Sequence, residues 1–185
     1  MGELQPDAGS LRMPSNARIG MVRQEAPGGT TTPLEAVLAT DKVRAGLLEE
    51  AATAQDPVRI AELHNRLVEI GAAAAPARAA RILGGLGFDD AAQGMPLSAF
   101  SGGWRMRVAL AAVLFTKPDL LLLDEPSNHL DLEARLWLEA HLSAFQGTLF
   151  LISHDRAMLN AICTSILHLD NKKLYLYKGN YDAYD

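Results

Sequence analysis

The sequence predicts an α/β fold built on a mainly parallel sheet, and two observations carry this prediction. Apolar runs at residues 120–123 and 148–152 have the length of strands, and each is followed by a segment with helical apolar spacing, at 133–145 and 156–162. Strands that alternate with helices in this way form parallel sheets. Because the first run is Leu120-Leu121-Leu122-Leu123, we expect a strand buried on both faces, with 148–152 as a second buried strand.

An earlier strand and three helices are expected ahead of this core. Residues 1–26 are predicted to be β structure, with a strand at 18–22 that ends at Gln24, before a Pro-Gly-Gly break. A helical stretch begins at the capping box Thr32-Pro33-Leu34-Glu35. A second helix begins after Asp56-Pro57 and stops at Gly71, and a third covers residues 76–86.

The second half of the chain is expected to alternate helices with strands. The spacing of apolar residues predicts a helix over 102–115. After the helix at 156–162 we expect a strand at 165–169, a polar turn at 170–172 and a strand at 174–177.

Composition excludes several classes of protein. The 185 residues carry 17 basic and 22 acidic side chains, a net charge of −5, so there is no global basic excess to drive nucleic-acid binding. Cys163 is the only cysteine, which rules out an internal disulfide and fits a cytoplasmic protein. The start of the chain lacks the apolar region of a signal peptide, and no apolar run approaches the ~20 residues that span a bilayer. We therefore expect no direct membrane insertion.

The strongest chemical signal is the pair Asp124-Glu125 at the end of the apolar run 120–123. The carboxyl ends of parallel strands are where α/β folds place their sites. Asp124 suits Mg²⁺ bound through waters, and Glu125 suits the orientation or deprotonation of an attacking water. The structural alternative is that both carboxylates cap the turn that follows, at residues 126–128.

A second signal is Ser101-Gly102-Gly103, which opens the helix at 102–115. A helix N-terminus presents free N–H groups, and glycines let a phosphate approach them closely. The alternative is a plain serine cap with a glycine loop. Two further residues follow strands: His154 comes after 148–152 and Gln24 after 18–22. A histidine there can reach a γ-phosphate, although a lone histidine is more often structural, and the amide of Gln24 can hold Mg²⁺ or the attacking water.

In chain order these signals resemble the motifs of the ATP-binding-cassette (ABC) ATPases. Gln24 matches the Q-loop, Ser101-Gly102-Gly103 the signature, Asp124-Glu125 the Walker B segment, residues 127–131 the D-loop and His154 the H-loop. The resemblance implies a P-loop-NTPase-like (RecA-like) nucleotide-binding domain with an inserted helical subdomain, and ATP and Mg²⁺ as cofactors. It implies catalytic roles for Glu125 and His154, metal binding by Asp124 and Gln24, and nucleotide contacts from Gln24, Ser101, Gly102, Gly103 and Asp131.

The finer resemblance is to the first cassette of the ABC-F family and, around residues 60–88, to its YheS-type branch. It is carried by Ser101-Gly102-Gly103-Trp104-Arg105, by the D-loop Ser127-Asn128-His129-Leu130-Asp131, and by Gly179-Asn180-Tyr181. That family implies a second cassette on the same full-length chain as partner, with the signature contacting ATP held by that cassette. It also implies the ribosome as a partner. The charge of 41–69, four basic against six acidic residues, is no footprint for RNA, so the ribosome link rests on resemblance.

The resemblance divides the chain into one partial domain. Residues 1–26 are expected to be a remnant of an N-terminal β region with the Q-loop, 32–93 the helical subdomain, 94–169 the signature helix and RecA-like core, and 170–185 a tail toward an interdomain linker. No G-x-x-x-x-G-K-[ST] occurs in the 185 residues. Since that P-loop holds the β- and γ-phosphates, we expect the N-terminal part of the domain to be missing and the isolated chain to be inactive and to bind ATP weakly.

Three other interpretations remain open. The ATPase subunit of a membrane transporter shares the core motifs, but Trp104, the D-loop and residues 179–181 argue against it. The C-terminal lobe of a chromosome-maintenance or DNA-repair ATPase also lacks a P-loop, but its Q-loop lies on the other lobe, whereas Gln24 and Ser101 share this one. A non-hydrolysing remnant that serves as an interaction module fits the absent P-loop and is weakened by the presence of Glu125 and His154.

Overall fold

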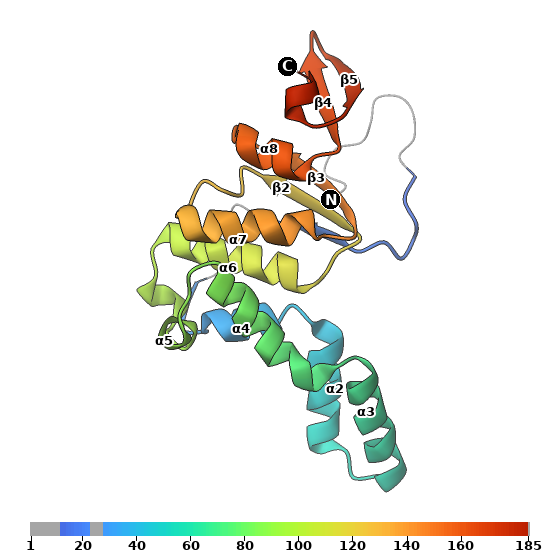
Figure 1. Cartoon of the computed structure of the whole chain (residues 1–185). Helices are drawn as coiled ribbons and strands as arrows, with labels where there is room; N and C mark the ends of the chain where they lie inside the picture. The colour runs from blue at the N-terminus through green and yellow to red at the C-terminus, as the bar shows by residue number, and fades with distance from the viewer. Residues whose placement is uncertain (1–11, 23–27, 185) are drawn as a thin grey trace.

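The computed structural model describes residues 12–22 and 28–184, and its centre is a parallel sheet (Figure 1). The strands β1 (Ile19–Met21), β2 (Leu120–Asp124) and β3 (Thr148–Ile152) lie in the order β1-β2-β3, with β2 parallel to both neighbours. The predicted α/β class with a mainly parallel sheet is therefore confirmed. The predicted strands after residue 164 also form, as β4 (Ser165–Asp170) and β5 (Lys173–Lys178), but they make a separate antiparallel sheet.

The sheet packs its helices on one face. Leu121 and Leu123 of β2 are buried, whereas Leu120 and Leu122 are only partly covered, and Phe150 and Ile152 of β3 are exposed. The expectation that the strand at 120–123 is buried on both faces was wrong, as was the expectation that 148–152 is a second buried strand. Alternate side chains point to opposite faces, and only one face meets helices in the described part of the chain. The core on that face comes from α6 (Gly102–Phe115) and α7 (Leu132–Ser143), with Val108, Ala111, Leu114 and Leu138 fully or almost fully buried.

A helical segment connects β1 to α6. Its members are α1 (Pro33–Leu38), α2 (Lys42–Thr53), α3 (Pro57–Glu69), α4 (Ala75–Gly85) and α5 (Asp90–Gln93), with short 3₁₀ turns at Ala72–Ala74 and Leu97–Ala99. The capping box at Thr32 and Glu35 is present. Two helices rather than one precede Asp56, because the Asp41 carboxylate caps a new helix at Arg44 N–H. The α2–α3 hairpin projects away from the sheet (Figure 1).

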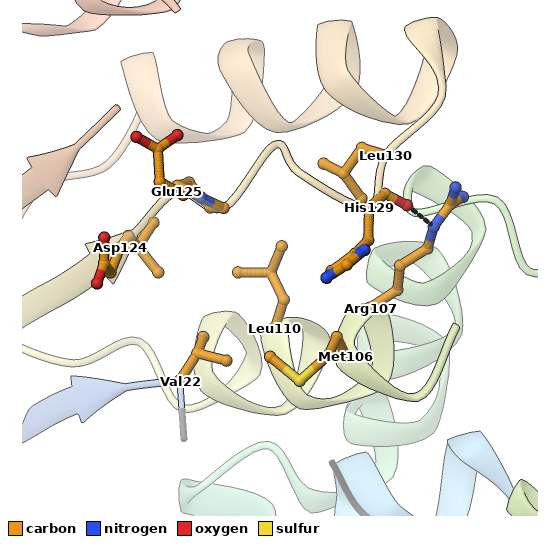
Figure 2. Close-up of a pocket in the computed structure, with 10 residues that line it drawn as sticks. Val22, Met106, Arg107, Leu110, Asp124, Glu125, His129 and Leu130 are labelled. Carbon is orange, nitrogen blue, oxygen red and sulfur yellow. Dashed lines mark hydrogen bonds between the residues drawn. The ribbon is translucent and has the colours of Figure 1, made fainter. Parts of the chain in front are cut away.

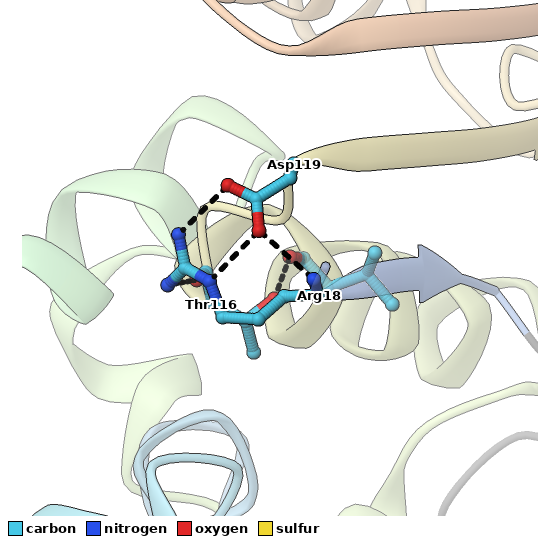
Figure 3. A network of polar contacts seen from close by, with 4 residues as sticks. Arg18, Thr116 and Asp119 are labelled. Atoms are coloured by element: carbon cyan, nitrogen blue, oxygen red, sulfur yellow. Dashed lines mark hydrogen bonds and ion pairs between the residues drawn. The ribbon is translucent and has the colours of Figure 1, made fainter. Parts of the chain in front are cut away.

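Hydrogen bonds and an ion pair link the segments that lead into β1 and β2. The Asp119 carboxylate accepts hydrogen bonds from the backbone N–H of Arg18 at 2.8 Å and from its guanidinium at 3.4 Å, and that guanidinium also reaches the Thr116 carbonyl (Figure 3). These contacts fix where β1 starts relative to β2.

The C-terminal segment forms a small unit beyond the sheet. Helix α8 (Arg156–Ile162) follows β3, and α9 (Tyr181–Tyr184) packs on the β4–β5 hairpin, at the opposite end of the molecule from the α2–α3 hairpin (Figure 1).

Candidate functional site at the carboxyl end of the sheet

The backbone turns sharply where β2 ends. Asp124 is the last residue of the strand and pairs with Ile152 of β3, and Glu125 follows in the left-handed region with φ 47°. The backbone N–H of Glu125 donates to the Ile152 carbonyl at 2.8 Å. A non-glycine residue held in that region costs about 1–3 kcal/mol, and such residues concentrate at functional sites. The turn places both predicted carboxylates at the carboxyl edge of the sheet (Figure 2).

The structure brings Glu125 and His154 together, as the sequence motifs implied. His154 Nε2 lies 3.3 Å from Glu125 Oε1, within ion-pair distance, but the two atoms make no hydrogen bond. The Glu125 side chain is mostly buried while His154 is 98% exposed. Glu125 Oε1 therefore has no hydrogen-bond partner in the described part of the chain. A buried carboxylate oxygen without a donor is ready to accept a proton or a hydrogen bond from a bound water.

A small hollow opens beside this edge, between α6 and the end of β2 (Figure 2). Its volume is about 50 Å³, enough for a few waters at roughly 10–15 Å³ each. Two carboxylate residues line it together with mainly apolar side chains. The lining residues are Val22, Met106, Arg107, Leu110, Leu123, Asp124, Glu125, Pro126, His129 and Leu130.

The start of α6 keeps its backbone donors open. Ser101 is the N-cap residue, yet its hydroxyl makes no capping hydrogen bond. The N-cap side chains of α1, α2, α3, α5, α7 and α8 all accept one. Both Ser101 and Gly102 are exposed, and a Cβ added at Gly102 would meet no atom within 4 Å. A 14-residue helix whose first N–H groups receive no bond from the N-cap side chain fits an anionic ligand.

Asp131 is occupied by contacts within the chain. It caps α7, with Oδ1 accepting from Ala134 N–H at 3.0 Å, and its Oδ2 accepts from Arg107 Nη1 at 2.9 Å. The Ala134 N–H and then the Arg107 guanidinium hold the pKa of this carboxyl below its usual value. The nucleotide contact expected of Asp131 therefore stays a prediction, since both oxygens already have donors.

The predicted metal ligands are Asp124 and Gln24. Gln24 lies outside the residues that the structure describes. Within those described, no group of three or more His, Cys, Asp or Glu side chains is placed to hold a metal ion. The exposed Asp124 carboxylate nevertheless fits Mg²⁺, which proteins commonly bind through one or two carboxylates together with substrate phosphates.

Arg107 is a further residue of this region, and the sequence motifs assigned it no role. The guanidinium lies 4.4 Å from the centre of the Trp104 ring, and its Nε donates to the His129 carbonyl at 2.7 Å. The side chain is only 8% exposed. The signal available in the sequence was an arginine followed directly by the apolar run 108–115 and placed three residues after a tryptophan. Such a charge is buried only when its donors are used.

Comparison with known proteins places this arrangement among nucleotide-binding cassettes. The family model described as ABC transporter matches residues 1–128. The human ATP-binding cassette sub-family F member 3 is 47% identical over 95% of this chain, and the bovine sub-family F member 2 is 48% identical over 93%. A probable ATP-binding protein, YheS, of Haemophilus influenzae is 45% identical over 99%. The chain spans 26%, 28% and 29% of these three relatives, respectively.

Solved structures agree in fold. The ATP-binding subunit of an ABC transporter superposes with a TM-score of 0.61 at 17% identity, covering 90% of this chain and 60% of that one. A dimeric post-hydrolysis structure of the cassette MJ0796 bound to ADP and Pi gives 0.56 at 21% identity, covering 88% and 63%. None of the helices in the described ranges has both the length and the apolar character to cross a bilayer.

Proposed function

Because the chain belongs to the ATP-binding-cassette family, and its relatives named above include sub-family F members, we propose that it forms the catalytic edge and signature of one cassette in an ABC-F type ATPase. The observation that carries the proposal is the carboxyl edge of β2, where Glu125 Oε1 is buried without a hydrogen-bond partner 3.3 Å from His154 Nε2. A strained, buried carboxylate beside an exposed imidazole is suited to hydrolysis at a ligand that approaches from solvent.

The proposed roles are those that the family motifs imply for these residues. Glu125 orients the attacking water and accepts its proton, and His154 contacts the γ-phosphate from the open side. Asp124 and Gln24 hold Mg²⁺, which when bound neutralises phosphate charge. Ser101, Gly102 and Gly103 offer hydroxyl and N–H donors to ATP held by a second cassette. In this arrangement each cassette completes the site of the other.

The remaining proposals concern organisation and partners. We assign residues 1–26 to a β region, although only 12–22 of them are among the described residues. We assign 32–93 to a helical subdomain, 94–169 to the signature helix and core, and 170–185 to a tail toward a linker. The second cassette belongs to the same full-length chain, and the protein works in the cytoplasm, in keeping with its single cysteine. Association with the ribosome is proposed from the resemblance to ABC-F proteins alone. Co-sedimentation with ribosomes in ATP tests it, and an unbound protein contradicts it.

Glu125→Gln tests the proposed chemistry in the protein translated from the whole reading frame that contains these 185 residues. Loss of the general base lowers turnover by about 10²–10⁴-fold, while bound ATP is retained. Glu133→Gln is the matched control, because Glu133 is an exposed acid in the first turn of α7, away from the strand end. Near-normal turnover in Glu125→Gln contradicts the role of Glu125. Absence of ATPase activity in the unmodified protein instead favours an interaction module.

A further inference from the structure

Arg107 belongs to helix α6, but its side chain bonds to residues outside that helix. Its Nε donates to the His129 carbonyl at 2.7 Å. Its Nη1 donates to the Leu86 carbonyl at 3.0 Å and to Asp131 Oδ2 at 2.9 Å. The guanidinium also stacks over Trp104. A planar, forked donor is the one side chain that serves three acceptors and an aromatic face together.

These acceptors come from segments far apart in the sequence. Leu86 follows α4 in the helical segment, while His129 and Asp131 belong to the loop between β2 and α7. Arg107 itself lies in the helix that begins beside Ser101. The side chain therefore ties the helical segment and the loop after Glu125 to the helix that carries the open N–H groups. Figure 2 shows Arg107 reaching the His129 carbonyl across this junction.

The surrounding backbone leaves room for the guanidinium. Gly87 has φ +95°, and a Cβ at this position would lie 2.9 Å from Arg107 Nη1. On the other side, Gly103 packs against His129, since a Cβ there would lie 3.5 Å from its Nδ1. Gly87 thus leaves the space that the guanidinium occupies, while Gly103 lies at ordinary contact distance from His129. Helix α6, the loop at 127–131 and the end of α4 meet around this one buried cation.

We propose that Arg107 is a positioning residue that sets the loop at 127–131 against the start of α6. The inference rests on the proposed function, because it makes Arg107 the link between the edge that carries Glu125 and the signature that faces the second cassette. Arg107 acts through His129 and Asp131, whose places relative to Ser101 it determines.

The test combines exchange and kinetics in the protein translated from the whole reading frame. Arg107→Met keeps an apolar stem but removes every donor, and Arg107→Lys keeps the charge with a single donating group. Arg66→Met is the matched control, because Arg66 is an exposed arginine in α3 that pairs with the exposed Glu69. Amide exchange is compared between Leu130, whose N–H donates to Ser127, and Leu121 and Leu123 in β2.

In Arg107→Met we expect at least tenfold faster exchange at Leu130 with β2 unchanged, and at least a tenfold lower kcat with the KM for ATP within threefold. Arg107→Lys is expected to recover part of both, and Arg66→Met to match the unmodified protein. A rise in exchange that is equal at Leu130 and in β2, or exchange at Leu130 that stays unchanged, overturns the proposal. If the unmodified protein shows no turnover, the proposed function fails, and the exchange comparison alone decides the role of Arg107.

Discussion

Two adjacent glycines at the end of α4 give a sharp test of how the helical segment is seated on the core. Gly85 faces Trp137 of α7, and a Cβ built on Gly85 would overlap the indole ring. A Cβ on Gly84 would meet nothing within 4 Å. Both residues are inside the helix as its last two members. Alanine at either position therefore gains similar helix propensity, and only one of the two alanines has to displace a side chain.

The difference between the two variants isolates the cost of the displaced ring. Replacing glycine by alanine in a helix stabilises it by up to ~1 kcal/mol. Forcing an extra carbon into a packed contact costs about 1–3 kcal/mol. We expect Gly84→Ala to raise the free energy of unfolding slightly. We expect the free energy of unfolding of Gly85→Ala to be about 1–3 kcal/mol lower than that of Gly84→Ala. The ring has partners that resist its movement, since Trp137 also stacks on His141 at 4.8 Å between ring centres.

Urea unfolding of the 185-residue chain, followed by tryptophan fluorescence, measures both variants. Equal midpoints, within about 0.5 kcal/mol after conversion, would refute the packing of α4 on α7. A shift in the native emission spectrum of Gly85→Ala but not of Gly84→Ala would tie the effect to Trp137 itself. The outcome bears on the site because Leu86, which follows this helix, supplies one of the carbonyls that Arg107 contacts.

Three further predictions concern charge and burial. Asp131→Asn keeps the cap on α7 but loses the ion pair with Arg107. Because the pKa of Asp131 is lowered in the folded state, its carboxylate stabilises the fold above pH ~4, and this stabilisation is lost as the pH falls through the lowered pKa. Because Asp131 is half-exposed, thermal melts should show a deficit of only ~0.5–1 kcal/mol in the free energy of unfolding at pH 7, and this deficit should close in acid. Burial lowers the pKa of His141, so stability should fall as the pH drops below 6.5, and His141→Gln should flatten that slope. Phe150→Thr, on the exposed face of β3, should reduce binding of an apolar dye without lowering the melting temperature, whereas Leu149→Thr, on the packed face, should lower it; equal melting temperatures would contradict the one-sided sheet.

Local signals predicted much of the fold. Helix starts were readable because a short polar side chain before an apolar run satisfies free N–H groups, as Thr32 and Asp56 do in the structure. Strand β3 was predicted with its observed bounds, since five residues of strong strand preference stand between turns. These features depend on neighbours within a few residues, which is what a sequence displays directly.

What the sequence did not reveal depends on contacts between distant residues. Nothing near Phe150 indicates that its face of the sheet lies uncovered, because the same apolar run suits a strand covered on both sides. Asp131 was assigned to a ligand from its motif, whereas its position beside Arg107 appears only when α6 and α7 are packed. The role of Arg107 was missed for the same reason, since its acceptors are 21, 22 and 24 residues away.

The meeting of Glu125 with His154 shows why the site was nevertheless recognisable. In the parallel pair β2–β3, Asp124 stands opposite Ile152, so Glu125 and His154 follow their paired positions by one and two residues. The left-handed turn at Glu125, held by its bond to the Ile152 carbonyl, then brings the carboxylate back toward β3. Because of this register, residues from two separate motifs lie at the same edge of the sheet. An acid or a histidine directly after a predicted strand has a predictable place, because neighbouring parallel strands end at the same edge of a sheet. The loops that follow then need to move such side chains only a few ångströms to bring them into contact.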